Sequence, residues 1–336
     1  MNDGCAAQMS VVLVTPDRYD NIRKTMEYLQ AQTVCDQLEI VIVAPSAATL
    51  DFDPAERAAF DSVRVVEVGE VQSTGRAIAA GVREASAPVV TYAEEHSYPA
   101  PGWAEALIKA HRQSWAVVGV AIANANPGNI ISWASLFTDF GPWVEPVEPG
   151  ETSRLAWHHS SYKRAVLLEY GSELDVLLEA EGILHKDLLA RGHRLYLESA
   201  AKTNHVNISL LASYARAEFH GARMFAANRA GVAKRSGFWR PLYICAMPLI
   251  PFLRLRRVLG HIFRSGRQRE LFPRILPALI VGLIADTLGQ LMGYAFGVGH
   301  SARHRVSFEL NRYQHVTEHD RAIREAAVKA HDPGYG

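Results

Sequence analysis

The sequence predicts an α/β fold with a mainly parallel sheet, followed by an α-helical C-terminal region. Short runs of β-branched residues alternate with helical patterns through the first 122 residues, as expected when helices connect successive parallel strands. Because 49% of the 336 residues are hydrophobic, the chain can bury a substantial core. Past residue 237 the composition becomes apolar and arginine-rich, which indicates a separate region.

The expected elements follow the periodicity of the apolar residues. Five runs are short enough to be buried strands, at residues 10–15, 39–43, 63–67, 88–92 and 115–122. The helices expected between them lie at residues 21–32, 75–85 and 102–114. Further along we expect a helix at 179–191 that ends at Gly192, a strand at 194–197 and a helix at 210–229.

Residues 124–150 are rich in Asn, Gly and Pro and also carry four large aromatic side chains. The aromatic residues are Trp133, Phe137, Phe140 and Trp143. A linker between domains would be less aromatic, so this composition predicts a long loop or a lid.

Charge and cysteine content restrict the partners and the compartment. Lys+Arg and Asp+Glu balance at 35 each, so the whole chain has no basic footprint for nucleic acid. The scattered Cys5, Cys35 and Cys245 show no pairing pattern, which favours a reducing compartment and a cytoplasmic catalytic domain. The first apolar run, residues 9–14, is too short for the core of a signal peptide.

The C-terminal region contains two apolar stretches, residues 238–253 and 275–297, with a cationic belt between them. The belt has one acid, Glu270, and seven arginines. The arginines are Arg254, Arg256, Arg257, Arg264, Arg267, Arg269 and Arg274. This pattern is typical of attachment to an anionic membrane surface. The alternative is a helical subdomain packed on the catalytic core, since three prolines interrupt the first stretch.

A full membrane span is not favoured for residues 275–297, because Asp286 near the middle would cost roughly 2.5 to 3.5 kcal/mol. We expect a hairpin or in-plane helices instead. The predicted organisation is therefore a catalytic domain at 1–236, a membrane-associated helical region at 237–300 and a polar C-terminal tail at 301–336.

The triplet Glu94-Glu95-His96 directly follows the expected strand at 88–92. Open α/β sheets bind their ligands at the carboxyl ends of the strands, where this triplet lies. Two carboxylates and an imidazole can hold a divalent ion, and the histidine favours Mn²⁺ over Mg²⁺. The alternative is a charged turn before Pro99.

The order of these features resembles the family 2 glycosyltransferases, which have the Rossmann-like GT-A fold of nucleotide-diphospho-sugar transferases. The first strand at 10–15 is followed by Gln32-Thr33, and residues 89–96 are similar to the family's acidic motif. The motif continues as Pro99, Pro101, Gly102 and Trp103. The chain looks like a variant in which Glu-Glu-His replaces the Asp-rich motif, and the resemblance covers its first two thirds.

The resemblance implies roles for particular residues. Glu181, which opens the helix that ends at Gly192, matches the family's catalytic base; the alternative is a solvated carboxylate in a first helical turn. The metal ligands would be Glu94, His96 and His205, although a lone loop histidine is as often simply hydrogen-bonded. The donor would contact Thr15, Arg76, Glu94 and Glu95. His158-His159-Ser160-Ser161 would line a sugar pocket or merely cap a helix.

Two segments depart from the family pattern. The family's Asp-Asp-Gly-Ser-like turn after the second strand, which contacts the nucleobase, is Ala44-Pro45-Ser46 here. The family's Ala-Arg-Asn-x-Gly segment is residues 77–81 without its Arg and Asn, and Arg76 is the nearest substitute.

The predicted function is transfer of a sugar, with inversion, from a nucleotide-sugar donor to a hydroxyl of a lipid-linked or polysaccharide acceptor. The enzyme would use a divalent cation and act at the cytoplasmic face of the membrane, as a peripheral or monotopic protein of cell-envelope polysaccharide synthesis. Three alternatives are a non-catalytic nucleotide- or sugar-binding protein of the same fold, a membrane-surface scaffold, and a nucleotidyltransferase. The last would need a glycine-rich loop with a lysine, and Thr15-Pro16-Asp17-Arg18 has neither.

Overall fold

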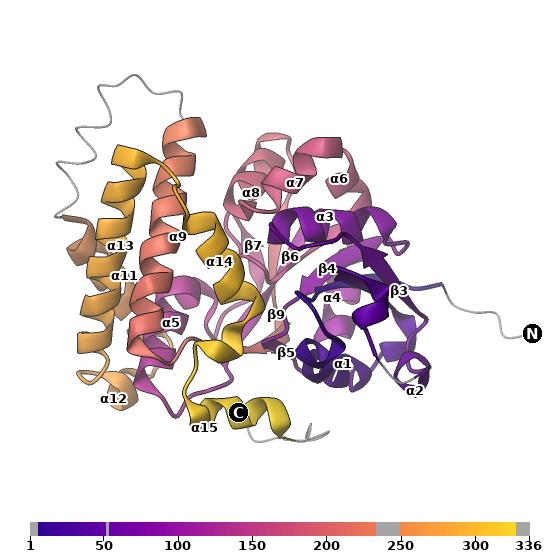
Figure 1. Cartoon of the computed structure of the whole chain (residues 1–336), viewed down its shortest axis with the longest axis horizontal. Coiled ribbons are helices and arrows are strands. Elements are labelled where there is room, and N and C mark those ends of the chain that lie inside the picture. Colours follow the sequence, from indigo (N-terminus) through magenta and orange to yellow (C-terminus); the bar gives the residue numbers. More distant parts are fainter. Residues whose placement is uncertain (1–5, 52–53, 233–248, 327–336) are drawn as a thin grey trace, which may run out of the picture. The chain divides into compact units, whose positions relative to one another are not determined.

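The computed structural model describes residues 6–51, 54–232 and 249–326, and these residues form two units (Figure 1). The sheet unit comprises residues 1–123, 145–205 and 324–336, and the helical unit comprises 124–144 and 206–323. This division differs from the predicted boundary at residue 236. The reason is that the helix after residue 210 packs on the C-terminal helices.

The sheet unit contains one mixed sheet in the order β3-β2-β1-β4-β8-β6-β9-β5, with β7 also paired to β9. Its strands are β1 (Met9–Val14), β2 (Leu38–Ala44), β3 (Ser62–Glu67), β4 (Val89–Ala93), β5 (Ser97–Pro99), β6 (Val117–Asn124), β7 (Gly150–Thr152), β8 (Ser160–Lys163) and β9 (Leu195–His205). The pairs β1–β2, β2–β3 and β1–β4 are parallel, whereas β8 is antiparallel to both β4 and β6.

The prediction of a mainly parallel sheet is therefore wrong for the second half of the sheet. β8 inserts between β4 and β6, and β5 and β7 pair antiparallel with β9. These strands escaped detection because β5, β7 and β8 are only three or four residues long and carry polar residues. The expected strand at 194–197 is the start of β9, which continues to His205.

The helices of the sheet unit are α1 (Arg23–Gln30), α2 (Pro54–Arg57), α3 (Thr74–Glu84), α4 (Trp103–His111), α6 (Arg164–Leu168), α7 (Leu174–Leu177) and α8 (Glu181–Ala190). Four of them, α1, α3, α4 and α8, agree with the predicted ranges, and the short helices α2, α6 and α7 were not predicted. α3 begins at a cap in which Ser73 Oγ accepts the Arg76 N–H. It approaches β1 so closely that a Cβ on Gly81 would lie 2.4 Å from Val12 Cγ1. Gly192 ends α8 with φ of 85°, as predicted.

The longest helices of the helical unit run side by side (Figure 1). The helices of this unit are α5 (Ile130–Phe140), α9 (Leu211–Val232), α11 (Ile250–Arg264), α12 (Gln268–Leu271), α13 (Leu276–Phe296) and α14 (Ser301–Leu310), and α15 (Glu318–Glu325) begins here. The predicted helix at 210–229 is confirmed as α9. Part of the tail expected at 301–336 is helical. It contains α14, which packs on α9.

Glycines bring α13 into close contact with α9. A Cβ on Gly282 would lie 2.2 Å from the Tyr214 hydroxyl, and one on Gly289 would lie 2.1 Å from the Phe219 carbonyl oxygen. Side chains larger than hydrogen would separate the two helices at these positions. By length and composition α13 could span a membrane, but 44% of its most apolar window is buried, and a core helix passes the same test.

The prediction of a loop or lid at 124–150 is wrong, because this segment contains the helix α5. Asn129 caps the helix by accepting the Ile131 N–H at 2.8 Å. Trp133 and Phe137, one helical turn apart, are buried at 2% and 1% exposure, so their rings are core residues of the helical unit. Most of the predicted apolar stretch at 238–253 lies outside the described residues, as do Cys5 and Cys245.

A buried ion pair joins α11 to α13. Arg254 contacts Asp286, and Asp286 also accepts a hydrogen bond from Gln290 Nε2 at 2.8 Å. Asp286 is only 3% exposed. The acid that the sequence shows in the middle of an apolar stretch is thus neutralised inside the helical unit, and one arginine of the predicted belt is committed to it.

We expect Asp286→Ala to lower the free energy of unfolding by roughly 3 kcal/mol, because it leaves the Arg254 guanidinium without its buried counter-charge. The double variant Arg254→Met/Asp286→Leu should recover most of this loss, since it removes both charges. Urea unfolding followed by circular dichroism measures both. Equal stabilities for the single variant and the unaltered protein would show that the pair does not stabilise the fold.

Stability should also fall in acid through His111, a buried residue of α4 whose Nε2 lies 2.9 Å from Ser161 Oγ. Burial, with Lys163 nearby, lowers the pKa of His111 from 6.5 to about 4. The unfolded chain therefore binds the proton more readily, and stability that is complete above pH 6.5 is lost as the pH falls toward 4.

The expected loss through this group is about 3 kcal/mol, from a shift of about 2.5 pKa units. His111→Gln keeps a hydrogen-bonding group but does not titrate, so urea unfolding at pH 7 and pH 4.5 should show a smaller acid loss for the variant. The same loss in both proteins would contradict the assignment.

Candidate functional site

The segment that follows β4 is held in place by α1. Thr25 Oγ1 donates to the Glu94 carbonyl oxygen at 3.0 Å. Gln32 clamps the continuation of the segment, because its Nε2 donates to the Ala100 carbonyl at 2.9 Å and its Oε1 accepts the Ala104 N–H at 3.0 Å. Thr25 therefore holds the backbone at Glu94, and the Gln32-Thr33 pair that suggested the resemblance holds the backbone at residues 100–104.

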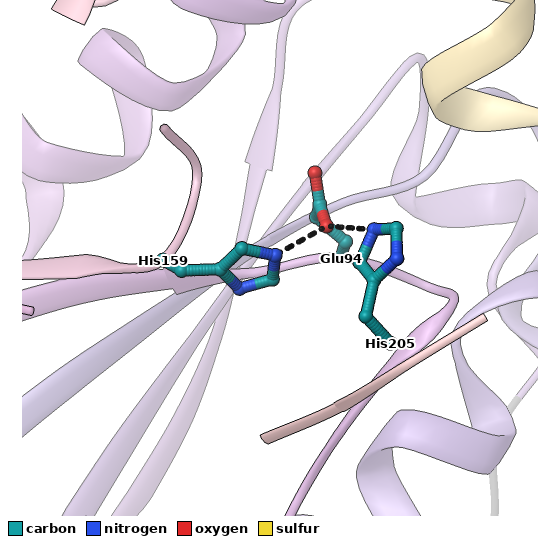
Figure 2. A group of neighbouring side chains, drawn as sticks. All are labelled: Glu94, His159 and His205. Carbon is teal, nitrogen blue, oxygen red and sulfur yellow. Dashed lines mark ion pairs between the residues drawn. The ribbon is translucent and has the colours of Figure 1, made fainter. Parts of the chain in front are cut away.

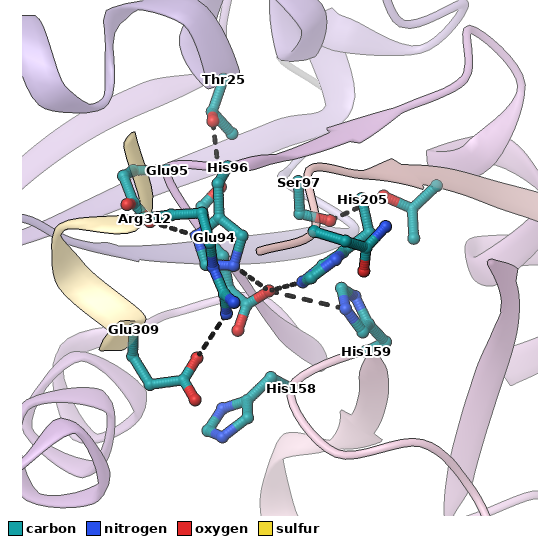
Figure 3. A network of polar contacts seen from close by, with 12 residues as sticks. Thr25, Glu94, Glu95, His96, Ser97, His158, His159, His205, Glu309 and Arg312 are labelled. Carbon is teal, nitrogen blue, oxygen red and sulfur yellow. Dashed lines mark hydrogen bonds and ion pairs between the residues drawn. The ribbon is translucent and has the colours of Figure 1, made fainter. Parts of the chain in front are cut away.

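Three imidazole rings face one oxygen of the Glu94 carboxylate (Figure 3), and two of them, those of His159 and His205, are drawn alone with it in Figure 2. Glu94 Oε2 lies 3.4 Å from His96 Nε2, 3.5 Å from His159 Nε2 and 3.5 Å from His205 Nε2. His159 directly precedes β8, and His205 is the last residue of β9. The His205 ring lies edge-on to the rings of His96 and His159. Neighbouring strands thus bring together residues more than a hundred positions apart.

This geometry keeps Glu94 ionised and His159 neutral. Burial raises the pKa of the Glu94 carboxyl, but His96, His205 and His159 lower it more strongly, so its pKa lies well below the usual value. Burial lowers the pKa of His159 to about 3. A carboxylate and a neutral imidazole are the protonation states in which these groups bind metal ions.

Glu94, His159 and His205 fit a metal ion. Each offers one ligand atom, and the three atoms lie within 4.8 Å of one another. Ligands about 2.1 Å from a tetrahedral ion lie about 3.4 Å apart, close to the oxygen-to-nitrogen distances here. One carboxylate and two imidazoles favour a transition ion over Mg²⁺ or Ca²⁺.

The third histidine, His96, supports this group without belonging to it. Its Nδ1 lies 2.5 Å from Glu95 Oε2, which orients the ring, and it is fully buried. The predicted metal set was Glu94, His96 and His205. The structure brings all three together, with His96 Nε2 3.4 Å from Glu94 Oε2, and adds His159 at the same oxygen; the spacing suited to a metal ion is that of Glu94, His159 and His205. Sequence reasoning placed His159 in a sugar pocket or a cap, because the antiparallel neighbour of β4 was not foreseen.

Glu181 lies beneath the turn that carries His158 and His159. It is 3% exposed; its Oε1 accepts the His158 N–H at 3.0 Å, and its Oε2 accepts the Tyr162 hydroxyl at 3.0 Å. His158 has a positive φ of 59°, which is unfavourable for a residue with a side chain. The carboxylate thus stabilises a strained turn next to the His159 imidazole.

The other expected donor contacts are spread over the sheet unit. Thr15 is fully buried, and its hydroxyl donates to the Arg18 carbonyl at 2.8 Å, so it shapes the loop after β1. Arg76 has a 77% exposed side chain in the first turn of α3 and lies 3.9 Å from Asp175. Glu95 is 4% exposed and faces His96. Of the predicted donor residues, the structure places only Glu94 and Glu95 at the histidine cluster.

The turn after β2, where the family's acid is missing, has a carboxylate from the neighbouring strand. Glu67 ends β3, and its Oε1 accepts the Ala47 N–H at 2.6 Å and the Ser46 hydroxyl at 3.2 Å. Sequence reasoning missed Glu67, since only the pairing of β2 with β3 brings it to this turn.

Comparison with known proteins agrees with this architecture. Residues 10–171, just under half of the chain, match the model of the family described as Glycosyl transferase family 2. Over these residues the match confirms the resemblance seen in the sequence and supports a sugar-transfer function, whereas the Glu-Glu-His variant of the motif stays a prediction. Among curated proteins, no sequence matches the chain.

Two solved structures are similar to the chain. One is TarS from S. aureus, with 14% sequence identity and a TM-score of 0.42, covering 85% of this chain; the chain spans 55% of the length of TarS. The other is the mannosyltransferase PcManGT from Pyrobaculum calidifontis in complex with GDP-Man and Mn²⁺. It shares 14% identity and a TM-score of 0.52, covering 85% of this chain and 87% of its own. The sheet unit is thus a GT-A-like α/β domain with a mixed sheet.

We expect the protein to bind one transition ion through Glu94, His159 and His205. Isothermal titration with Mn²⁺ should show binding that Glu94→Gln and His159→Gln abolish. His96→Gln should weaken binding by about 10 to 100 fold, because it removes only a supporting contact. The matched control is His193→Gln, at a half-buried histidine of the same unit. Unchanged Mn²⁺ affinity in His159→Gln would exclude this ligand set.

Proposed function

We propose that this protein is a glycosyltransferase that moves a sugar from a nucleotide-sugar donor to an acceptor hydroxyl with inversion. One observation carries the proposal: the Glu94 carboxylate, at the carboxyl end of β4 in a family 2 domain, faces His159 and His205 at metal-ligand spacing. In open α/β sheets this is the edge where ligands bind.

The metal ion of this proposal is a divalent cation, with Mn²⁺ preferred to Mg²⁺ because two of its ligands are imidazoles. A bound cation would neutralise negative charge on the diphosphate leaving group. PcManGT, which has a similar fold, was solved with GDP-Man and Mn²⁺. That complex supports the proposal that a nucleotide sugar and a divalent cation bind together in this protein. His96 and Glu95 would hold the Glu94 carboxylate in place.

The donor would lie along the carboxyl ends of β1 to β4. The Glu67 carboxylate, at the turn after β2, takes the place of the acid that contacts the nucleobase in the family pattern. Thr15 would shape the loop beside the nucleotide, and the exposed Arg76 guanidinium would approach the diphosphate.

In the reaction, the acceptor oxygen would attack the anomeric carbon while the bond from that carbon to the diphosphate oxygen breaks. The acceptor proton would pass to a base, for which we propose Glu181. Its carboxylate already accepts two hydrogen bonds, so it also positions the turn of His158 and His159. These two roles are separable, because a glutamine accepts the same N–H but is not a base.

The proposed acceptor is a lipid-linked or polysaccharide hydroxyl at the cytoplasmic face of the membrane, and the protein would be peripheral or monotopic. The exposed arginines of the helical unit support this location, since they provide positive charge toward anionic lipid. Synthesis of cell-envelope polysaccharide is the process that would use such an enzyme.

A non-catalytic binding protein of the same fold remains the second candidate. The absence of the family's acid after β2 and of its Arg and Asn at 77–81 favours it. It would bind a nucleotide sugar without turnover, so transfer activity separates the two functions.

We expect one class of nucleotide sugar to raise the melting temperature of the protein in the presence of Mn²⁺, when UDP-, GDP-, dTDP- and CMP-sugars are compared with and without the ion. Ligand at 100 times its dissociation constant adds about 2.7 kcal/mol of stability. With that donor, Glu181→Gln should lower kcat by about 10² to 10⁴ fold while metal and donor binding persist.

Glu84→Gln is the matched control, since Glu84 is exposed at the end of α3. Full transfer by Glu181→Gln would show that Glu181 is a positioning residue and not the base. Donor binding without any turnover in the unaltered protein would favour the non-catalytic candidate.

A further inference from the structure

The helices α11 and α13 form an antiparallel hairpin within the helical unit. The start of α11 lies beside the end of α13, since Ile250 and Leu291 pack against the same buried pair, Ala226 and Tyr294. The Arg254 contact with Asp286 continues this alignment toward the middle of the hairpin. The turn that joins the helices contains α12.

Both helices of the hairpin expose large apolar side chains, which we name the apolar stripe. Its members are Phe252, Leu253 and Phe263 on α11 and Ile280, Ile284 and Leu288 on α13, each between 47% and 72% exposed. On α13 the three residues recur every four positions, so they share one helical face. That face lies opposite Gly282 and Gly289, which pack on α9.

The stripe is accompanied by positive charge. Residues 249–285 contain seven arginines and one acid, Glu270. Three of the arginines are committed within the unit: Arg254 to Asp286, Arg264 to the carbonyls of residues 141, 142 and 144, and Arg267 to Glu270. The exposed side chains of Arg256, Arg257, Arg269 and Arg274 leave the hairpin with a net positive surface.

We propose that the apolar stripe is the surface by which the protein docks on an anionic lipid bilayer, with the hairpin lying in the plane of the interface. The inference rests on the proposed function, because it supplies the route to a membrane-bound acceptor. Large apolar side chains with arginines among them suit the boundary between anionic headgroups and acyl chains. A second copy of the chain would bring arginines against arginines across a two-fold axis, which is unfavourable.

The in-plane orientation follows from the middle of the hairpin. Arg256 and Arg257 lie in the central part of α11 and are exposed, so a spanning hairpin would place two guanidinium groups in hydrocarbon. The buried face of α13 is also covered by α9, which carries several charged side chains. In the interface, by contrast, the arginines reach phosphate while the stripe enters the acyl region.

The test is flotation of the full-length protein with vesicles. One set of vesicles contains phosphatidylcholine alone, and the other contains about one anionic phosphatidylglycerol in three lipids. We expect binding to the anionic vesicles that weakens with salt. Phe252→Asn and Ile284→Asn should each weaken it by about tenfold, because each removes exposed apolar area. Arg256→Gln and Arg257→Gln should each weaken it by about fivefold.

Matched controls lie in the sheet unit. Val176, on α7, is 72% exposed like Phe252, and Arg112 is exposed after the end of α4. Val176→Asn and Arg112→Gln should leave vesicle binding unchanged. All six variants should keep the midpoint of urea unfolding of the unaltered protein, which confirms that they are folded.

Separate outcomes would overturn separate claims. Binding of Mn²⁺ and donor without binding to vesicles would overturn the docking surface and leave the proposed function intact. Binding to vesicles without binding of metal or donor would overturn the proposed function and leave the docking surface intact. A dimer in sedimentation that Phe252→Asn makes monomeric would assign the stripe to a second copy. Resistance of the bound protein to alkaline carbonate extraction would overturn the in-plane orientation.

Discussion

The Glu94 carboxylate can bind a metal ion only if it remains ionised in a buried place, where water is scarce. Burial alone would favour the protonated acid, and the surrounding imidazole rings reverse this preference. Much of the sheet unit can be understood from this requirement. The strand β8 lies next to β4 and so brings His159 close to the Glu94 carboxylate. The strand β9 is long enough to bring its last residue, His205, to the same carboxylate. Glu181 then stabilises the strained backbone before β8.

The helical unit solves a similar problem by a different route. Asp286 is surrounded by apolar residues of α13 and is matched by a guanidinium from α11 and an amide from its own helix. Nearby, burial raises the pKa of the Glu218 carboxyl well above its usual value, and the Asp139 carboxylate raises it further.

The sequence predicted the parts of the fold that depend on local periodicity. β1, β2, α3 and α9 appear close to where the apolar pattern placed them, because β1 and β2 are buried along their whole length and α3 buries an apolar face. It could not predict β5, β7 or β8, whose few polar residues become strands only through their neighbours. The helix α5 was missed for another reason: its aromatic residues were interpreted as a lid, although Trp133 and Phe137 have helical spacing. For the site, Glu94 and His205 follow from motif order, whereas His159 depends on an antiparallel pairing that no local signal shows.

Gln32 illustrates what this arrangement means for sequence change. Its amide is used at both ends, as donor to Ala100 and as acceptor from Ala104, and neither partner is a side chain. Glutamate has the same length but cannot donate, and asparagine has both groups but is one methylene shorter. A residue far from any substrate is therefore as restricted in its chemistry as a ligand. The backbone of its neighbours, whatever their side chains, sets that restriction.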